Sequence, residues 1–342
     1  MGNRTTEEKR EFLRSLRPPD LHRHFDGSVR PKTLWDLSQK YYSAIPGLGY
    51  EAFRGKLTYD PETDRDLLDY LGKFDIPLQY TQFYDNIQTI AEQIGRDAYA
   101  EGIRTLEVRI NPIIHQRAGL TSRQVLSAVR KGLREVMRAH EDFRAGVVAI
   151  AMRNHGGNMA KILLRSLTGE IDRFHRDLGV VAFDIAGAEK PFPPILFVEP
   201  YRLAEQMGLR KTVHVGEDEG VERVWEAVDL LAPQRIGHAV SAAADPRLLK
   251  RLADEKIAVE VCLTSNLQTG AVERLEDHPL PRFLEAGIRC ALCTDNPTVS
   301  RTDILREYAV AQDTFGFSDD DMARLARMAE EATFIVPLPR GE

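Results

Sequence analysis

Short apolar, β-branched runs recur along this chain of 342 residues, and most are followed by a longer amphipathic stretch. Two runs are continuously apolar, VVAIAM and VVAFDI, as expected for parallel strands buried on both faces. The stretch 121–140 instead has the apolar spacing of a helix. The pattern predicts eight strands: Asp20–Asp26, Thr105–Pro112, Gly146–Met152, Val180–Gly187, Lys211–Glu217, Arg235–His238, Ala258–Leu263 and Arg289–Asp295.

Strands that alternate with helices form parallel sheets through repeated βαβ units. Eight such units close into a barrel, so the predicted fold class is α/β, a (β/α)8 TIM barrel. Residues 27–104 make the first connection abnormally long, and they contain several helical patterns. We interpret them as a helical insertion over the mouth of the barrel, within a single domain that spans residues 1–342.

Composition narrows the function classes. The formal net charge is −6 and no basic patch stands out, so we expect no nucleic-acid partner. No apolar run is long enough to cross a bilayer, and the N-terminus is polar rather than signal-like, so we expect no membrane partner. Three cysteines do not suggest a disulfide framework. They suit a reducing compartment, and we expect a cytoplasmic protein.

Polar residues gather at the ends of the predicted strands, where the chemistry of such barrels lies. These residues are His22, His24, Asp26, His214, Glu217, His238, Asp295 and Asn296. Singly, each has a structural explanation: the His-x-His pair could be a solvated edge, and an Asp before Asn-Pro could be a turn. Jointly, they fall where one barrel would bring them to a single point.

The strand geometry favours a metal site. Residues i and i+2 of a strand point the same way, so His22 and His24 face one point. His214 and Asp295 can reach that point from the fifth and eighth strands. Three imidazoles and one carboxylate suit zinc with a position left for water, which the metal would acidify into a nucleophile.

One feature limits the expected site to a single metal ion, and two others exclude alternative metal sites. The fourth predicted strand lacks the lysine that a bridged two-metal site would need at its end. Cys290 and Cys293 are three residues apart on a strand, so they point to opposite faces and cannot chelate together. The H-x-E…P-C-x-x-C signature of the zinc cytidine deaminases is absent. We interpret His155, in NHGGN, as part of a polar turn rather than a pocket residue.

Five segments carry a resemblance to a known family: DLHRHFDGS, TVHVGE, RIGHA, CLTSN and TDNP. In this order they resemble the motifs of the adenosine deaminase family, in the amidohydrolase superfamily, and they span residues 20 to about 335. The resemblance implies a (β/α)8 barrel and one catalytic zinc ion per chain. It also implies a hydrolase acting on the C–N bond of a cyclic amidine, a 6-aminopurine.

The resemblance further implies roles for individual residues. The zinc ligands would be His22, His24, His214 and Asp295. Glu217 would donate a proton to purine N1, and His238 would stabilise the hydroxide and the tetrahedral centre. Asp295 would also orient or deprotonate the water.

The same motifs imply substrate contacts. Gly187 would present its backbone N–H to N3, Asp26 would accept the ribose 5′-hydroxyl, and His24 would lie beside the substrate. The family usually has a second Asp where this chain has Asn296, whose amide can still donate to N7. It often has an acid where this chain has Ala188.

The small-molecule substrate expected from these motifs is adenosine or 2′-deoxyadenosine, converted to inosine or 2′-deoxyinosine and ammonia. Aminodeoxyfutalosine, a menaquinone precursor, and free adenine are alternatives within the same chemistry. More remote alternatives are another zinc amidohydrolase, which would not need Glu217, and a non-catalytic barrel. The sequence pattern does not define an oligomeric state.

Overall fold

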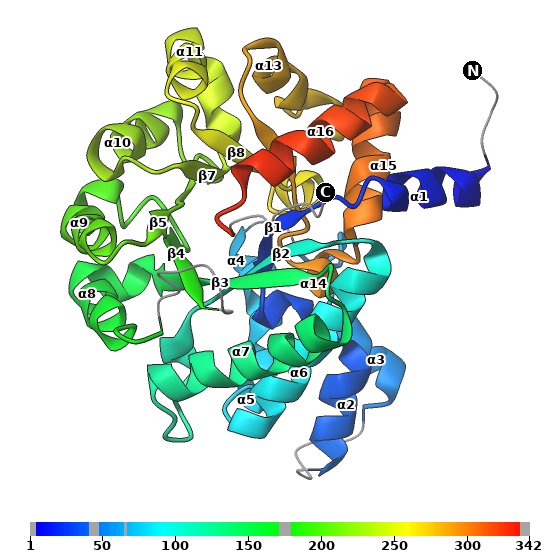
Figure 1. The fold of residues 1–342 in the computed structure, drawn as a ribbon, viewed down its shortest axis with the longest axis vertical. Helices are drawn as coiled ribbons and strands as arrows, with labels where there is room; N and C mark the ends of the chain where they lie inside the picture. The colour runs from blue at the N-terminus through cyan, green and yellow to red at the C-terminus, as the bar shows by residue number, and fades with distance from the viewer. Residues whose placement is uncertain (1–4, 41–47, 65–66, 171–178, 336–342) are drawn as a thin grey trace.

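The computed structural model describes residues 5–40, 48–64, 67–170 and 179–335, which form parallel strands surrounded by helices (Figure 1). Within these ranges the strands are β1 (Asp20–His24), β2 (Thr105–Ile110), β3 (Arg144–Met152), β4 (Val180–Ala186), β5 (Arg210–Lys211), β6 (His214–Val215), β7 (Arg235–His238), β8 (Ala258–Val261) and β9 (Cys290–Leu292). They pair side by side in chain order, β1 to β5 in one sheet and β6 to β9 in a second, and every pairing is parallel.

Two seams close these sheets into one barrel. Beside β1, the Arg23 backbone bridges to Asp295, and the N–H of His24 donates to the Asp295 carbonyl at 2.8 Å. Between β5 and β6, the N–H of Thr212 donates to the Phe183 carbonyl at 3.0 Å, which continues the pairing with β4. The predicted fold class, an α/β TIM barrel, is confirmed.

The strands end earlier than the sequence pattern predicts. The predicted strand Lys211–Glu217 consists of β5 and β6, and it ends at Val215 because Gly216 takes a positive φ of 76° that turns the chain. Likewise β1 ends at His24, since a 3₁₀ turn begins at Asp26. The polar residues that follow several strands therefore lie on turns at the barrel mouth rather than within strands.

Most helices follow a strand. Figure 1 shows an outer layer around the barrel that consists of α7 (Ser122–Ala139), α8 (Gly156–Ser166), α9 (Val198–Gln206), α10 (Val221–Leu231), α11 (Pro246–Asp254), α13 (Leu280–Glu285), α15 (Ile304–Phe315) and α16 (Asp319–Ala332). The short helices α12 (Leu263–Gln268) and α14 (Pro297–Ser300) instead follow β8 and β9 beside the site residues at the barrel mouth. The predicted helix 121–140 is α7. It begins where Thr121 and Gln124 form a capping box, which satisfies two backbone N–H groups.

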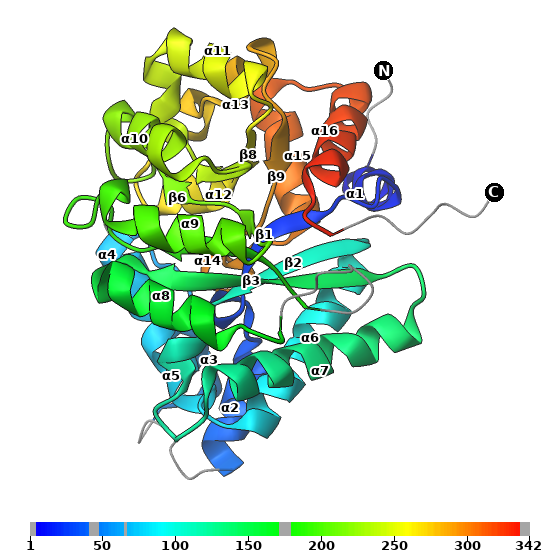
Figure 2. The ribbon, with the colours of Figure 1, turned by 60° about the vertical axis from the view of Figure 1, so that its left-hand side comes forward.

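The connection between β1 and β2 consists mainly of helices, as Figure 2 shows: α2 (Pro31–Lys40), α3 (Tyr50–Lys56), α4 (Leu67–Leu71), α5 (Asp75–Tyr80) and α6 (Tyr84–Glu101). Helix α6 packs on α7 through Gly132, where a Cβ would lie 2.2 Å from the Gln88 carbonyl. Helices α4 and α5 instead supply part of a cavity wall at the barrel mouth.

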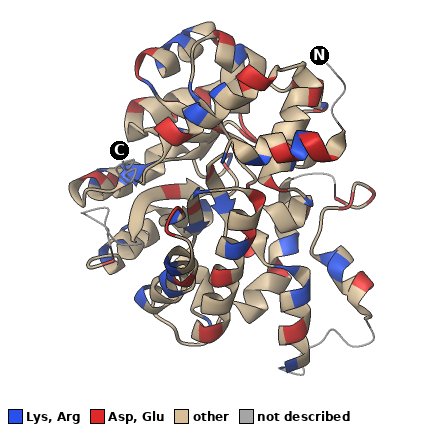
Figure 3. Cartoon of the chain, turned by 45° about the vertical axis from the view of Figure 1, so that its right-hand side comes forward, with Lys and Arg blue, Asp and Glu red and all other residues tan. Residues whose placement is uncertain are grey.

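The surface carries charge of both signs. Acidic and basic residues alternate along the outer helices in Figure 3, and α1 (Thr6–Ser15) packs against α15 through such residues. None of the described helices is long and apolar enough to cross a membrane.

Candidate active site

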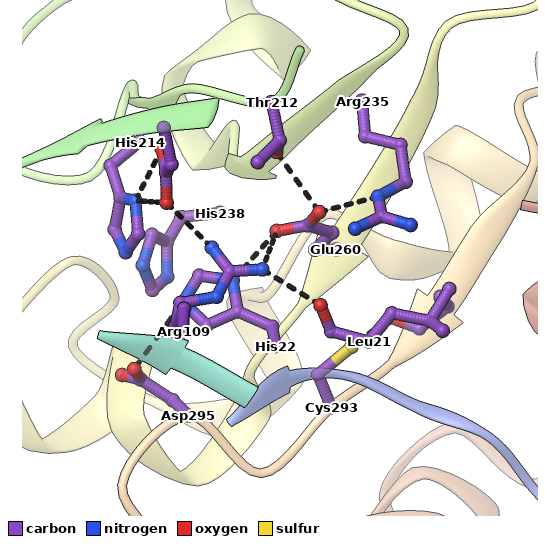
Figure 4. A network of polar contacts seen from close by, with 12 residues as sticks. Leu21, His22, Arg109, Thr212, His214, Arg235, His238, Glu260, Cys293 and Asp295 are labelled. Atoms are coloured by element: carbon purple, nitrogen blue, oxygen red, sulfur yellow. Dashed lines mark hydrogen bonds and ion pairs between the residues drawn. The ribbon is translucent and has the colours of Figure 1, made fainter. Parts of the chain in front are cut away.

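Four histidines and one aspartate converge at the C-terminal ends of the strands. Figure 4 shows His22, His214, His238 and Asp295 among them. His22 and His24 come from β1, His214 from β6 and His238 from β7, and Asp295 follows β9. The Nε2 atom of His24 lies 3.2 Å from Nε2 of His214 and 3.2 Å from Oδ1 of Asp295. The Nε2 atom of His22 lies 3.4 Å from the same carboxylate oxygen. The four ligands predicted from the sequence are thus brought together.

Two carboxylates orient two of these rings from behind. Nδ1 of His22 lies 2.8 Å from Oε2 of Glu260, on β8, and Nδ1 of His214 lies 2.9 Å from Oδ2 of Asp184, on β4. Each carboxylate can only accept, so each Nδ1 bears a proton, and in the neutral ring Nε2 then keeps a free lone pair. Carboxylates commonly orient metal-binding histidines in this way.

A buried ion network holds those two carboxylates (Figure 4). Arg109 donates to Asp184 at 2.9 Å and to Glu260 at 2.8 Å, and Arg235 donates to Glu260 at 2.6 Å. Neighbouring His214 and the Arg109 guanidinium hold the pKa of Asp184 at about 2 against the opposing effect of burial. Arg109 and Arg235 likewise hold the pKa of Glu260 well below its usual range. Both carboxylates therefore stay ionised at neutral pH.

These residues fit a metal ion. Nε2 of His22 is buried and has no hydrogen-bond partner among the described residues, which is unusual for a polar atom in a folded core. Burial lowers the pKa of His24 and His214, so both are neutral, as metal ligands must be. A second set of ligand atoms, from His22, His238 and Asp295, also lies within metal-binding reach.

The backbone is strained at two of these positions. His238 and Asp295 have φ values of 67° and 58°, in the left-handed region that non-glycine residues seldom adopt. Such strain collects at functional sites, where the surrounding structure enforces it. For Asp295 it is enforced by hydrogen bonds to β1 and by Ser265, whose hydroxyl donates to Oδ2 at 2.6 Å.

Glu217 lies beside this cluster, on the turn after β6. Its Oε1 accepts from the Thr269 hydroxyl at 3.1 Å, and its Oε2 lies 3.6 Å from Nε2 of His238. Burial, together with the charges of Asp295 and Glu189, raises the pKa of Glu217 well above its usual range. A raised pKa favours the protonated carboxyl group, the form that a proton donor requires.

The turn that carries Glu217 is held by a single buried carboxylate. Glu189 accepts from the N–H of Gly216 at 2.9 Å, of Glu217 at 2.9 Å and of Asp218 at 3.3 Å. From the opposite side, Arg153 donates to the His214 carbonyl at 2.7 Å. The backbone on both sides of the strand end is therefore fixed by buried charged groups.

A cavity of about 240 Å³ opens onto these residues. The predicted site residues on its wall are His24, Asp26, Gly187, His214, Glu217, His238, Asp295 and Asn296, and helices α4 and α5 cover it with Leu67, Tyr70, Leu71, Asp75 and Leu78. Burial raises the pKa of Asp26 to about 6.

The side chain of Asn296 has room only because a glycine, Gly27, lies in the turn that follows β1. A Cβ at Gly27 would lie 2.0 Å from Oδ1 of Asn296, so only glycine leaves room for this amide. Oδ1 of Asn296 is buried and unpaired among the described residues. Asn296 lines the cavity, and its NH₂ group is a donor of the kind that a ring-nitrogen acceptor requires.

One expectation was wrong and other residues were missed. His155 does lie in a turn, Arg153–His155, but it also lines the cavity. Asp184, Glu260 and Arg109 were missed, although a charged residue inside an apolar strand signals them. Tyr70, whose hydroxyl lies 2.7 Å from Oγ of Ser300, carried no such signal.

Comparison with known proteins shows that this chain belongs to the adenosine deaminase family. The adenosine deaminase family model matches residues 19–339. An adenosine deaminase of Erwinia tasmaniensis is 38% identical over 314 residues, which cover 91% of each chain.

Two solved structures share the fold. The N6-methyl-AMP deaminase of Arabidopsis thaliana is 26% identical and has a TM-score of 0.81, with 95% of this chain and 94% of that chain covered. A zinc-bound amidohydrolase of Burkholderia ambifaria superposes with a TM-score of 0.85 at 23% identity, with 98% of this chain and 90% of that chain covered.

Proposed function

We propose, because this chain belongs to the adenosine deaminase family, that it hydrolyses adenosine and 2′-deoxyadenosine to inosine or 2′-deoxyinosine and ammonia. The observation that carries the proposal is one cavity that contains both a set of metal-binding side chains and a buried carboxyl group with a raised pKa, that of Glu217. A simple metal-binding protein would not need that acid. The cytoplasmic location expected from the sequence stays a prediction.

We assign one zinc ion to His22, His24, His214 and Asp295. Zinc is favoured because three neutral imidazoles and a carboxylate are its usual ligands at a catalytic site. When bound, it would supply an acidified water as the nucleophile. The orphaned Nε2 of His22 and the carboxylates behind His22 and His214 support this assignment.

The chain's own residues perform the proton transfers and hold the substrate. Glu217 would protonate N1, which makes C6 electrophilic as the nucleophile attacks. Asp295 would orient the water, and His238 would stabilise the oxygen that adds to C6. Gly187, at a positive φ of 100°, would bring its backbone close to N3, and Asn296 would donate to N7.

The cavity favours a neutral nucleoside over a nucleotide. Among its described lining residues there is no lysine or arginine to pair with a phosphate, whereas Asp26 and Asp75 would repel one. Asp26 can instead accept the ribose 5′-hydroxyl, the contact that we assign to it. The Arabidopsis N6-methyl-AMP deaminase is named for a nucleotide substrate, so the two enzymes should differ in how they treat a phosphate.

The test is an ultraviolet assay of 6-amino loss with the purified holoenzyme. The substrates are adenosine, 2′-deoxyadenosine, adenine, aminodeoxyfutalosine and AMP. We expect the two nucleosides to have kcat/KM values at least about 100-fold above AMP, since a phosphate would be left unpaired beside carboxylates. A preference for AMP, adenine or aminodeoxyfutalosine would overturn the substrate assignment, and no turnover of any compound would overturn the function.

A further inference from the structure

A chain of hydrogen bonds runs from the backbone of α13 to His238. The N–H of Leu280 lies 3.1 Å from Nδ1 of His278, and Nε2 of His278 lies 3.2 Å from Oδ1 of Asn266. Nδ2 of Asn266 then lies 2.9 Å from Nδ1 of His238. All three side chains are at most 2% exposed, so water does not compete for these contacts.

The direction of every bond follows from the first. A backbone N–H can only donate, so Nδ1 of His278 accepts. Burial lowers the pKa of His278 to about 3, so its ring is neutral and its single proton lies on Nε2. That proton goes to Oδ1 of Asn266, and the NH₂ group of Asn266 consequently donates to Nδ1 of His238. His238 must therefore carry its own proton on Nε2, at the cavity.

Two other histidines of the cluster, His22 and His214, have the opposite arrangement. Nδ1 of His22 and Nδ1 of His214 face carboxylates and bear the proton, which leaves their Nε2 lone pairs for a metal. An amide donor behind His238 removes that lone pair from the cavity side. Although the Nε2 atoms of all these rings gather at one place, hydrogen-bond direction separates metal ligands from a donor.

We propose that Asn266 and His278 are positioning residues that fix His238 as an Nε2–H donor, and that His238 is therefore neither a metal ligand nor a general base. The donor is available, because Oε2 of Glu217 at 3.6 Å is too distant to accept a hydrogen bond from it. In the proposed function, on which only this last step rests, the N–H stabilises the oxygen that adds to C6.

The tautomer can be measured without turnover. In holoenzyme labelled with ¹⁵N-histidine, two-bond ¹⁵N–¹H correlation spectra distinguish Nε2–H from Nδ1–H rings, and His238→Gln identifies the signal. We expect the Nε2–H pattern for His238. An Nδ1–H pattern or an imidazolium would overturn the proposal, even if the protein proved to deaminate nothing.

Kinetics test whether the direction of the hydrogen bond from Asn266 to His238 affects turnover. In Asn266→Asp the side chain keeps its shape but only accepts, so it would draw the His238 proton to Nδ1. We expect kcat to fall about 10²- to 10⁴-fold, the effect of a wrong histidine tautomer at an active site, while KM changes less. Near-normal kcat in a variant that retains its metal would overturn the proposed role.

His278 offers a matched pair of variants that leaves Asn266 intact. In His278→Gln, an amide can still accept from Leu280 and donate to Asn266, so the direction of the chain survives. In His278→Leu the side chain can neither accept nor donate, so the direction of the chain is no longer fixed. We expect the Gln variant to retain at least about 10-fold more kcat than the Leu variant, since it keeps two hydrogen bonds. Equal losses in both would indicate a merely structural role and would contradict the proposal.

Discussion

The interior of the barrel and its mouth shift the pKa values of buried carboxyl groups in opposite directions. In the interior, Arg109 and Arg235 pair with Asp184, Glu260 and Glu107 at 2.5–2.9 Å, and the pKa of Asp184 lies near 2. At the mouth, burial raises the pKa of Glu217 and of Asp26 instead.

The difference shows how one fold sets two kinds of carboxyl group. A carboxylate beside a guanidinium is ionised despite burial, because the Coulomb attraction exceeds the desolvation cost. A carboxyl group in a cavity without such a cation has its pKa raised by burial, so it holds its proton to a higher pH. The ion pairs of the interior stay charged and hold the structure in place, whereas the carboxyl groups and imidazoles at the mouth can still exchange protons or bind a ligand.

Removal of the metal should have the largest effect. Because three imidazoles and a carboxylate form the expected ligand set, the purified protein should contain about one zinc ion per chain. A chelator should abolish turnover, and added zinc should restore it. Metal analysis with two tightly bound ions, or full activity without any, would refute the single-zinc assignment.

At the mouth, Glu217→Gln should lower kcat about 10²- to 10⁴-fold, because the amide cannot give a proton to N1. Metal content should not change, since Glu217 is not assigned as a ligand. Glu219→Gln alters the same residue type in the same turn but not on the main cavity wall, and it should remain active. Normal turnover of Glu217→Gln would exclude the proton-donor role.

In the interior, Arg109→Met should lower the free energy of unfolding by about 3–5 kcal/mol, because it leaves buried carboxylates short of a cation. The measurement is denaturant unfolding of the metal-bound protein. Arg247→Met is the control, because its pair with Asp245 is 85% exposed at the arginine and its loss should change the free energy of unfolding far less. Similar small losses in both would mean that the interior network is not stabilising.

Asp26→Ala should have the smallest and most selective effect. Loss of a charged hydrogen-bond acceptor for the 5′-hydroxyl should cost adenosine about 10- to 100-fold in kcat/KM. Adenine has no ribose and is the internal control, so its kcat/KM should change little. An equal loss on both substrates would count against a sugar contact for Asp26.

Much of this site could be predicted from short segments. His22 and His24 share one side of a strand by the period of two, and both lie in the cluster as expected. Asp295 and Glu217 were placed by their position after apolar runs. The strand limits were less accurate, because Gly216 and the strained backbone at Asp295 turn the chain before the apolar pattern ends.

Local sequence determined the strand order, the barrel and the residue types at the strand ends, because alternation of apolar runs and helical patterns reflects burial along the chain. Only the tertiary structure decided which partner lies behind each histidine. Glu260 behind His22 and Asn266 behind His238 are separated from them by 238 and 28 residues. A carboxylate accepts and an amide can donate, so these distant contacts, and not the histidines themselves, decide which ring offers a lone pair and which offers a proton.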